Sequence, residues 1–297
     1  MLHLPPIRSN SPRMGQAELV ASRRSSNIGV PPYGALGNLI RFGPTSESFQ
    51  STVRSLERVN IKDKRVVIAG GSSGIGLATA KNLAQAGAQV MVASRSPQKL
   101  ERARASVGPA LKTHVLDVTV ESQIISFFQS VGRFDHLVVT ASTAIFGPFL
   151  ELDVRAAREF FDSKFWSAYM LVRYGAANIA SNGSVTLVSG AASQRGTPGL
   201  AAGSAINAAL EALGRTLSLE LAPIRVNTIA PGLIETPVWD DLMPQQAKNQ
   251  LFAETAAKLP LRRIGTADDV AHTVRYVIEN DYTTGSVLFP DGGYLQV

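Results

Sequence analysis

Short apolar runs alternate with longer amphipathic stretches from residue 61 to the end of this chain. Seven apolar runs have the length and composition of buried β-strands, and they span residues 66–69, 89–93, 113–116, 136–140, 184–189, 225–229 and 286–289. Stretches with helical periodicity lie between them, at 75–86, 97–106, 120–130, 153–180, 200–221 and 267–279. Strands that alternate with helices of about ten or more residues predict right-handed βαβ units. We therefore expect an α/β fold with a Rossmann-type, doubly wound, mostly parallel sheet flanked by helices.

The residues before this pattern differ from the rest of the chain. Residues 1–44 mix Pro, Ser, Gly and Arg without a sustained period, which predicts an irregular extension, and residues 46–60 predict a short amphipathic helix. The chain thus divides into a basic extension over 1–60 and a single domain over 61–297. Three interpretations of the extension stay open: a flexible tail or a start codon assigned too early, with Met14 as the other start; a transit peptide; and a partner- or membrane-binding arm.

The net charge of +6 is concentrated in that extension. Residues 1–60 hold seven Arg and three Glu, a charge of +4, which leaves +2 for the remaining 237 residues. The domain therefore lacks the basic surplus that nucleic-acid binding requires, and we expect no nucleic-acid partner.

Several kinds of chemistry are excluded by what the sequence lacks. It has no cysteine, which removes disulfides, thiolate nucleophiles and cysteine-based zinc sites. We expect no metal site, because no metal-ligand spacing occurs among the four histidines, which are His3, His114, His136 and His272. No apolar run approaches the roughly 18–20 residues that span a bilayer, and the N-terminus lacks the features of a secretory signal. We expect no membrane partner and a cytoplasmic location, with organellar import through the extension as the alternative.

A glycine-rich loop joins the first predicted strand to the first predicted helix. It reads Ala69-Gly70-Gly71-Ser72-Ser73-Gly74-Ile75-Gly76, in which Gly70, Gly74 and Gly76 form G-x-x-x-G-x-G. Glycine permits a tight turn and a close backbone approach to a pyrophosphate, and the helix N-terminus offers free N–H groups to the anion. The loop therefore predicts a dinucleotide site.

The spacing of this loop resembles that of the short-chain dehydrogenase/reductase family. Further matches run through residues 61–297, and they are Asp117-Val118, Arg225-Val226-Asn227, Pro231-Gly232 with Thr236, Arg263 with Gly265, Asp269-Val270-Ala271 and Asp291-Gly292-Gly293. The resemblance implies a nicotinamide-dependent oxidoreductase that forms a homodimer or homotetramer through the helices at 153–180 and 200–221. It implies a cofactor site made of Gly70, Ser72, Ser73, Gly74, Ile75, Gly76, Ser94, Arg95, Asp117, Val118, Thr140, Ala141, Ser142, Pro231, Gly232, Ile234 and Thr236.

The end of the second strand bears on the choice of cofactor. NAD enzymes usually place a carboxylate here, which accepts hydrogen bonds from the ribose hydroxyls, but this chain has Ser94 followed by Arg95. A carboxylate would repel a 2′-phosphate, whereas an arginine can pair with it. We therefore expect NADP(H); the alternative is that Arg95 is an ordinary solvated charge.

The catalytic residues of the family are not conserved in this chain. Family members usually act through Asn, Ser, Tyr and Lys, with Tyr as the proton donor. In the register set by the small residues after position 207, Gly203 replaces the Tyr, Asn207 the Lys and Gly190 the Ser, with Ser189 beside it. The Asn of the preceding helix aligns with Lys164. The usual proton donor is therefore absent.

The residues suggest one compensation for this loss. Lys and Asn of the family pattern have changed places, so that Lys164, Asn207 and Ser189 form the candidate catalytic set. Lys164 would bind the cofactor ribose or polarise the substrate; the alternative is a helix residue whose amine reaches water. Ser204, Gln194 and Arg195 are candidates to orient a substrate. We expect residues 236–251 to form a lid over the substrate. Its apolar contacts would come from Trp239, Met243 and Phe252, and Phe146 and Phe149 would face them. These residues favour a hydrophobic substrate, although packing within the lid explains them almost as well.

These observations favour one function over two others. We expect an atypical NADP(H)-dependent oxidoreductase that reduces a hydrophobic carbonyl, enone or imine by hydride transfer without the Tyr/Lys pair. A catalytically silent NADP(H)-binding sensor or scaffold fits the same features. Non-redox chemistry in the same pocket has no positive signal.

Overall fold

The structure, a computed structural model, describes residues 60–297. The predicted irregular extension and, apart from Asn60, the short helix predicted at 46–60 lie outside the described residues, and so do the interpretations of the extension. Within the described residues, no helix is long and apolar enough to cross a membrane.

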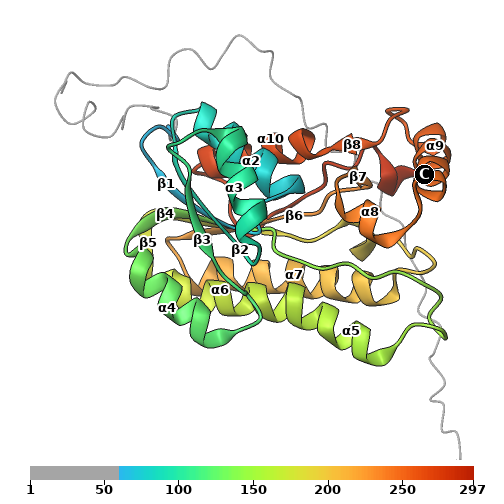
Figure 1. Ribbon diagram of the computed structural model, residues 1–297, viewed down its shortest axis with the longest axis horizontal. Helices are drawn as coiled ribbons and strands as arrows, with labels where there is room; N and C mark the ends of the chain where they lie inside the picture. The colour runs from blue at the N-terminus through green and yellow to red at the C-terminus, as the bar shows by residue number, and fades with distance from the viewer. Residues whose placement is uncertain (1–59) are drawn as a thin grey trace, which may run out of the picture. The chain divides into compact units, whose positions relative to one another are not determined.

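A seven-stranded sheet forms the centre of the domain (Figure 1). Its strands are β1 Arg65–Ala69, β2 Gln89–Ser94, β3 Lys112–Val115, β4 Phe134–Val139, β5 Ile179–Val188, β6 Arg225–Ile229 and β9 Val287–Leu288. They lie in the order β3-β2-β1-β4-β5-β6-β9, and every neighbouring pair is parallel. The predicted Rossmann-type, doubly wound α/β fold is confirmed.

Two layers of helices cover the sheet, one on each face (Figure 1). The first layer contains α2 Gly74–Gln85, α3 Pro97–Val107 and α10 Ala267–Glu279. The second contains α4 Glu121–Val131, α5 Val154–Phe161, α6 Ser167–Gly175 and α7 Ala201–Glu220. Each layer closes a separate apolar core, because side chains alternate between the two faces of a strand: Leu83 and Val274 belong to the first core, and Phe127 and Leu210 belong to the second.

The strand order places a crevice at one edge of the sheet. The chain runs outward from β1 to β2 and β3, then returns to β4 on the other side of β1. The connections after β1 and β4 therefore separate, and ligands of doubly wound sheets bind at such a switch point, beyond the carboxyl ends of the strands.

The prediction of one continuous helix over 153–180 is wrong, because the helix is interrupted and ends before residue 180. It is divided into α5, a π-helical turn at Asp162–Trp166 and α6, and a 3₁₀ turn at Ala176–Asn178 leads directly into β5. This strand starts at Ile179, five residues before the apolar run at 184 that predicted it. The pairing with β4 shifts register between Phe134 and His136, so the first residues of β5 form an irregular part of the ladder and need not be apolar.

The segment predicted as a lid contains regular structure that the sequence did not reveal. Helices α8 Val238–Leu242 and α9 Gln245–Lys258 lie between β7 Ile234–Glu235 and β8 Gly265–Thr266, which pair as a two-stranded parallel sheet. Trp239 and Phe252 meet edge to face with ring centroids 5.9 Å apart, so these two residues pack on each other within the lid.

Candidate active site

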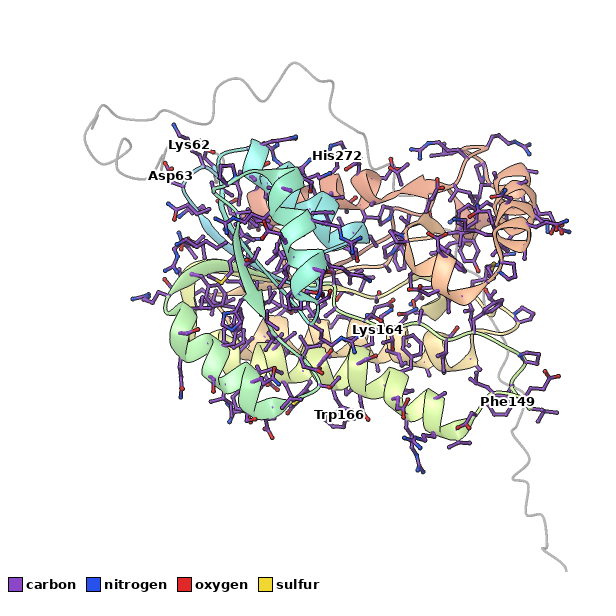
Figure 2. All side chains as sticks on the ribbon, in the orientation of Figure 1. Lys62, Asp63, Phe149, Lys164, Trp166 and His272 are labelled. Carbon is purple, nitrogen blue, oxygen red and sulfur yellow. The ribbon has the colours of Figure 1, made fainter. Side chains whose placement is uncertain are left out.

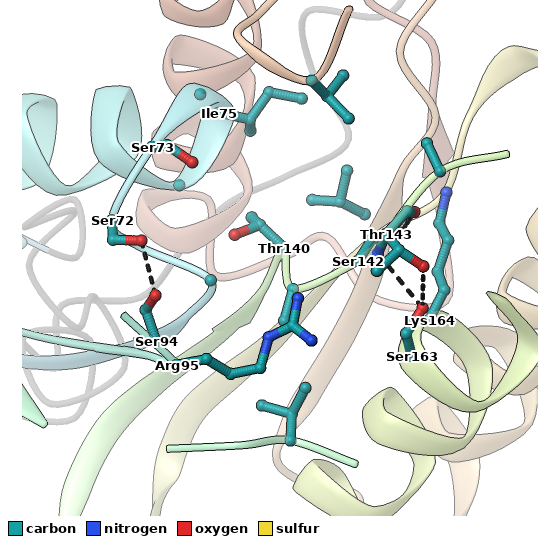
Figure 3. A pocket seen from close by; sticks show the side chains of 18 of the residues that line it. Ser72, Ser73, Ile75, Ser94, Arg95, Thr140, Ser142, Thr143, Ser163 and Lys164 are labelled. Atoms are coloured by element: carbon teal, nitrogen blue, oxygen red, sulfur yellow. Dashed lines mark hydrogen bonds between the residues drawn. The ribbon is translucent and has the colours of Figure 1, made fainter. Parts of the chain in front are cut away.

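A cavity of about 400 Å³ lies at the switch point, beyond the carboxyl ends of β1, β2, β4 and β5 (Figure 3). Thirteen of the seventeen predicted cofactor residues line it: Gly70, Ser72, Ser73, Gly74, Ile75, Gly76, Ser94, Arg95, Val118, Thr140, Ala141, Ser142 and Thr236. Lys164 and Ser189 of the candidate catalytic set also line it. Residues that are more than 160 positions apart in the chain are thus brought together by the sheet topology.

The glycine loop is packed so closely that two of its positions exclude a side chain. A Cβ on Gly76 would lie 2.3 Å from the backbone oxygen of Gly70, and one on Gly70 would lie 2.4 Å from the nitrogen of Ala141. Gly70 also has a φ of +92°, a backbone conformation that favours glycine. Ser73, which precedes α2, makes no capping hydrogen bond with its side chain. The first N–H groups of α2 therefore have no side-chain cap and suit the pyrophosphate of a dinucleotide.

The end of the cavity beside β2, where the sequence predicts that the adenosine binds, carries positive charge. Ser72 donates a hydrogen bond to Ser94 over 2.7 Å, and the side chain of Arg95 extends into the cavity (Figure 3). Lys99, which the sequence reading missed, also lines it and follows Ser96, the N-cap of α3. No carboxylate is found among the described residues that line the cavity. This lining fits an anionic dinucleotide, so the residues present are compatible with the cofactor that the sequence predicts.

Four predicted cofactor residues do not line the cavity. The side chain of Ile234 is buried in the core between the sheet and α10, and Gly232 packs against Asp291. Pro231 accepts a hydrogen bond from the backbone N–H of Ala191. Their contact with a cofactor stays a prediction.

Asp117, the fourth of these residues, caps the turn that follows β3. Its carboxylate accepts hydrogen bonds from the backbone and the hydroxyl of Thr119. Burial would raise the pKa of Asp117, but these two hydrogen bonds and the charge of Arg95 outweigh it and lower the pKa. The positive charge of Arg95 thus favours the ionised form of Asp117. Contact of Asp117 with a cofactor also stays a prediction.

Lys164 lies on the π-helical turn and reaches inward, whereas Trp166, two residues later, points away from the molecule (Figure 2). Its ammonium donates hydrogen bonds to Oδ1 of Asn207 over 2.7 Å and to the backbone oxygen of Ser189 over 3.2 Å. The predicted catalytic trio is thus in direct contact. Lys164 is partly buried and lines the cavity, and desolvation lowers its pKa to about 8.

Gly190 and Gly203, the positions predicted to replace the family's serine and tyrosine, differ in how much room surrounds them. A Cβ on Gly190 would lie 2.8 Å from the amide nitrogen of Asn207, so Asn207 occupies the space beside it. A Cβ on Gly203 would meet no atom nearer than 3.7 Å, on the ring of Phe160. Position 203 therefore has room for a Cβ, whereas position 190 does not.

The remaining substrate candidates do not line the cavity. Gln194 donates a hydrogen bond to Glu211, and Arg195 donates one to the backbone oxygen of Tyr294 over 2.7 Å while lying over its ring. Neither residue lines the cavity, nor does Ser204. Phe146 and Phe149 of the loop before α5 are exposed to solvent. Glu211 itself was missed by sequence reasoning, because a charged residue on a helix usually marks a solvated face.

Comparison with known proteins identifies the family of this chain. A protein-family model described as enoyl-(acyl carrier protein) reductase matches residues 69–295. The short-chain dehydrogenase/reductase ATR9 of Stachybotrys chlorohalonatus is 31% identical over 248 residues, which cover 78% of this chain and 97% of that protein. D-erythrulose reductase of Gallus gallus is 29% identical over 248 residues, covering 80% and 98%. A small-chain dehydrogenase solved in complex with NADPH is 34% identical, with a TM-score of 0.68 over 80% of this chain and 100% of that one.

Proposed function

This chain belongs to the short-chain dehydrogenase/reductase family of oxidoreductases, and we propose that it reduces a hydrophobic carbonyl, enone or imine with NADP(H), without the family's Tyr/Lys pair. The observation that carries the proposal is the contact of Lys164 with Asn207 beside the cavity. It provides a fixed ammonium in a pocket where the phenol is missing.

The preference for NADP(H) over NAD(H) rests on the charge at the end of β2. Arg95 and Lys99 line the cavity there, and no acidic residue of the described part of the chain does. A guanidinium can form two parallel hydrogen bonds with a phosphate, whereas the ribose hydroxyls of NAD(H) would leave it without a partner. The related dehydrogenase that was solved with NADPH is consistent with this preference.

Lys164 is the group that we assign to the reacting oxygen or nitrogen. When bound, the nicotinamide supplies the hydride. An ammonium has three N–H groups, and two of them are donated to Asn207 and Ser189, which leaves one for a substrate. A pKa of about 8 makes this ammonium a stronger acid than an ordinary lysine while keeping it mostly protonated at pH 7. It is still a weak donor, which favours conjugated carbonyls and imines, since these need the least acid assistance.

The substrate class follows from the side chains around Lys164. Phe160, Val188 and Val238 line the cavity on that side, together with Ala144. The hydroxyl groups of Ser142, Thr143 and Ser163 lie beside Lys164 as well (Figure 3), so we infer a substrate that joins an apolar body to a polar reacting group.

A panel assay separates this proposal from a silent NADP(H)-binding protein. NADPH oxidation would be followed with aromatic ketones, conjugated enones and cyclic imines, with NADH in parallel. We expect turnover of at least one unsaturated or imine substrate, faster with NADPH. Tight NADPH binding without turnover of any of these substrates would instead identify a sensor or scaffold.

We also infer a homodimer or homotetramer. Trp166 and Tyr169 on the π-helical turn and α6 are 48% and 42% exposed, which is unusual for two adjacent aromatic rings on a monomer surface. Light scattering on the purified chain would give its mass, and a strictly monomeric chain would contradict this inference.

A further inference from the structure

Glu211 is a buried carboxylate with no ion-pair partner in the described part of the chain. It lies on α7, is 1% exposed and does not line the cavity. Its oxygens accept hydrogen bonds from the hydroxyl of Ser189 over 3.1 Å, the amide of Gln194 over 2.7 Å and the hydroxyl of Ser193. Burying a carboxylate is unfavourable unless such donors compensate it, so three convergent donors define a specific arrangement.

The two oxygens that hold Lys164 belong to the two segments that Glu211 connects. One is the backbone oxygen of Ser189, immediately after β5, and the other is Oδ1 of Asn207 on α7. Glu211 follows Asn207 by four residues and so lies on the same face of the helix. Its carboxylate holds the side chain of Ser189, whose carbonyl holds the ammonium. The carboxylate therefore fixes the spacing between both acceptors of Lys164.

The turn after Ser189 packs on α7 through Gly190, which lies against the amide of Asn207. Gly190 follows, and without a side chain it cannot anchor the peptide group that carries the Ser189 oxygen. Beyond it, the backbone of Ala191 is bonded to Pro231 on the sheet side. The hydrogen bonds between this turn and α7 are those that the side chains of Ser189, Ser193 and Gln194 donate to Glu211.

We propose that Glu211 is a positioning residue for Lys164: it ties the turn after β5 to α7 and so keeps the Ser189 carbonyl and the Asn207 amide at the ammonium. The catalytic part of this inference rests on the proposed role of Lys164. The positional part does not, because it concerns the surroundings of the amine in the protein as it stands.

The first test measures the amine itself and needs no substrate. Lysines would be acetylated with acetic anhydride at pH 6–10, and the extent at each lysine would be read by mass spectrometry, with Lys99 as a comparator in the same cavity. In the wild type, Lys164 should become reactive with a midpoint near pH 8. In Glu211→Leu the midpoint should fall by about half a pH unit or more, because the charged amine loses hydrogen-bond acceptors. An unchanged or higher midpoint overturns the proposal.

The second test compares variants by turnover. Glu211→Leu should lower kcat about tenfold or more while the KM for NADPH changes less than about threefold, because the donor is displaced and the cofactor end is untouched. Glu211→Gln should keep kcat within about threefold, since its carbonyl can still accept from the serines while the amide of Gln194 turns round. Glu220→Leu, at the exposed end of the same helix, is the matched control and should leave both values unchanged.

A smaller change covers the case in which Glu211→Leu does not fold. Ser189→Ala removes the hydroxyl that reaches Glu211 and leaves the carbonyl that reaches Lys164, so it should shift the midpoint and kcat in the same direction by about half as much on a logarithmic scale. Wild-type values for both in folded Ser189→Ala would contradict the proposal. If Lys164→Met keeps full turnover, the proposed function fails, and the acetylation midpoints still decide the role of Glu211.

Discussion

Glycines at the two ends of the cavity occupy very different surroundings. At the cofactor end, a Cβ on Gly76 would lie 2.3 Å from a backbone oxygen, and Gly70 is equally tightly enclosed. At the catalytic end, Gly203 stands where the family has its tyrosine, and the nearest atom to a Cβ there is 3.7 Å away. The first glycines are imposed by close packing. No close contact requires a glycine at position 203, which is consistent with the proposed loss of the tyrosine there.

The positively charged side chains at the two ends also differ in their surroundings. Arg95 and Lys99 at the adenosine end are the kind of exposed cations that any anionic ligand can use. Lys164 is instead held by two neutral oxygens and is shielded enough to lower its pKa to about 8. A buried amine without a carboxylate partner costs stability, and such groups are retained mostly at functional sites.

The largest effect is expected from the same substitution made at both ends. Gly76→Ala should cost about 3 kcal/mol, seen as lost stability or weakened NADPH binding, because its Cβ has no room and the neighbouring atoms belong to the backbone. Gly203→Ala should raise stability by about 0.5–1 kcal/mol, because alanine is the better helix former. Thermal unfolding and NADPH titration of the two variants would show whether each substitution raises or lowers stability and NADPH affinity. Equal effects at the two positions would remove the distinction between them.

Acid should weaken the scaffold that both ends share. His136 on β4 is 1% exposed, and burial, helped by the charges of Arg225 and Lys64, lowers its pKa from 6.5 to about 4. The unfolded chain therefore binds one more proton between these two values, and the free energy of unfolding should fall by about 3 kcal/mol as the pH drops from 6.5 to 4.

Urea unfolding at several pH values measures this loss. His136→Asn can keep the hydrogen bond to Ser184 and should flatten the profile across that window. A profile as steep as that of the wild type would assign the acid sensitivity to other groups.

Cofactor choice should respond to one side chain at the adenosine end. Arg95→Asp should weaken NADPH binding about 30-fold, or about 2 kcal/mol, and change NADH binding much less, because only the former carries the 2′-phosphate. Arg102→Asp, on the exposed side of α3, makes the same charge change outside the cavity and serves as the control. An equal loss of affinity for NADPH and NADH would show that Arg95 does not contact the 2′-phosphate.

The smallest effect concerns the serine position of the family. Gly190→Ser should cost about 1 kcal/mol, although serine is the usual residue there, because its Cβ would displace the amide of Asn207. Asn207→Ala should relieve this cost, and a double-mutant cycle on stability measures the coupling. Additive costs would mean that the two positions do not share the space.

The strands of the sheet and the glycine-rich loop could be predicted from the sequence because each has a local sequence pattern. Buried parallel strands read as short apolar runs, and the loop lies between a strand and a helix. The π-helical turn that carries Lys164 was not predicted, since the change of hydrogen-bond partner leaves the side-chain pattern of residues 153–180 looking helical. Glu211 was missed because its donors are 17 to 22 residues away in the chain, and only the folded turn brings them to it.

The contact between Lys164 and Asn207 could be anticipated from the sequence only as an exchange within the family pattern. Its geometry, with Ser189 supplying the second oxygen, depends on where β5 ends and on how α7 faces the π-helical turn. The catalytic role of Lys164 and Asn207 therefore has to be measured directly.

That measurement is the Lys164→Met variant, with single-turnover rate and NADPH affinity determined side by side on the best substrate of the panel. Methionine fills a similar volume without the charge, so the account predicts a rate at least about 100-fold lower and an NADPH dissociation constant changed less than about tenfold. A wild-type rate in this variant would contradict the assignment of Lys164 as the group that serves in place of the missing tyrosine.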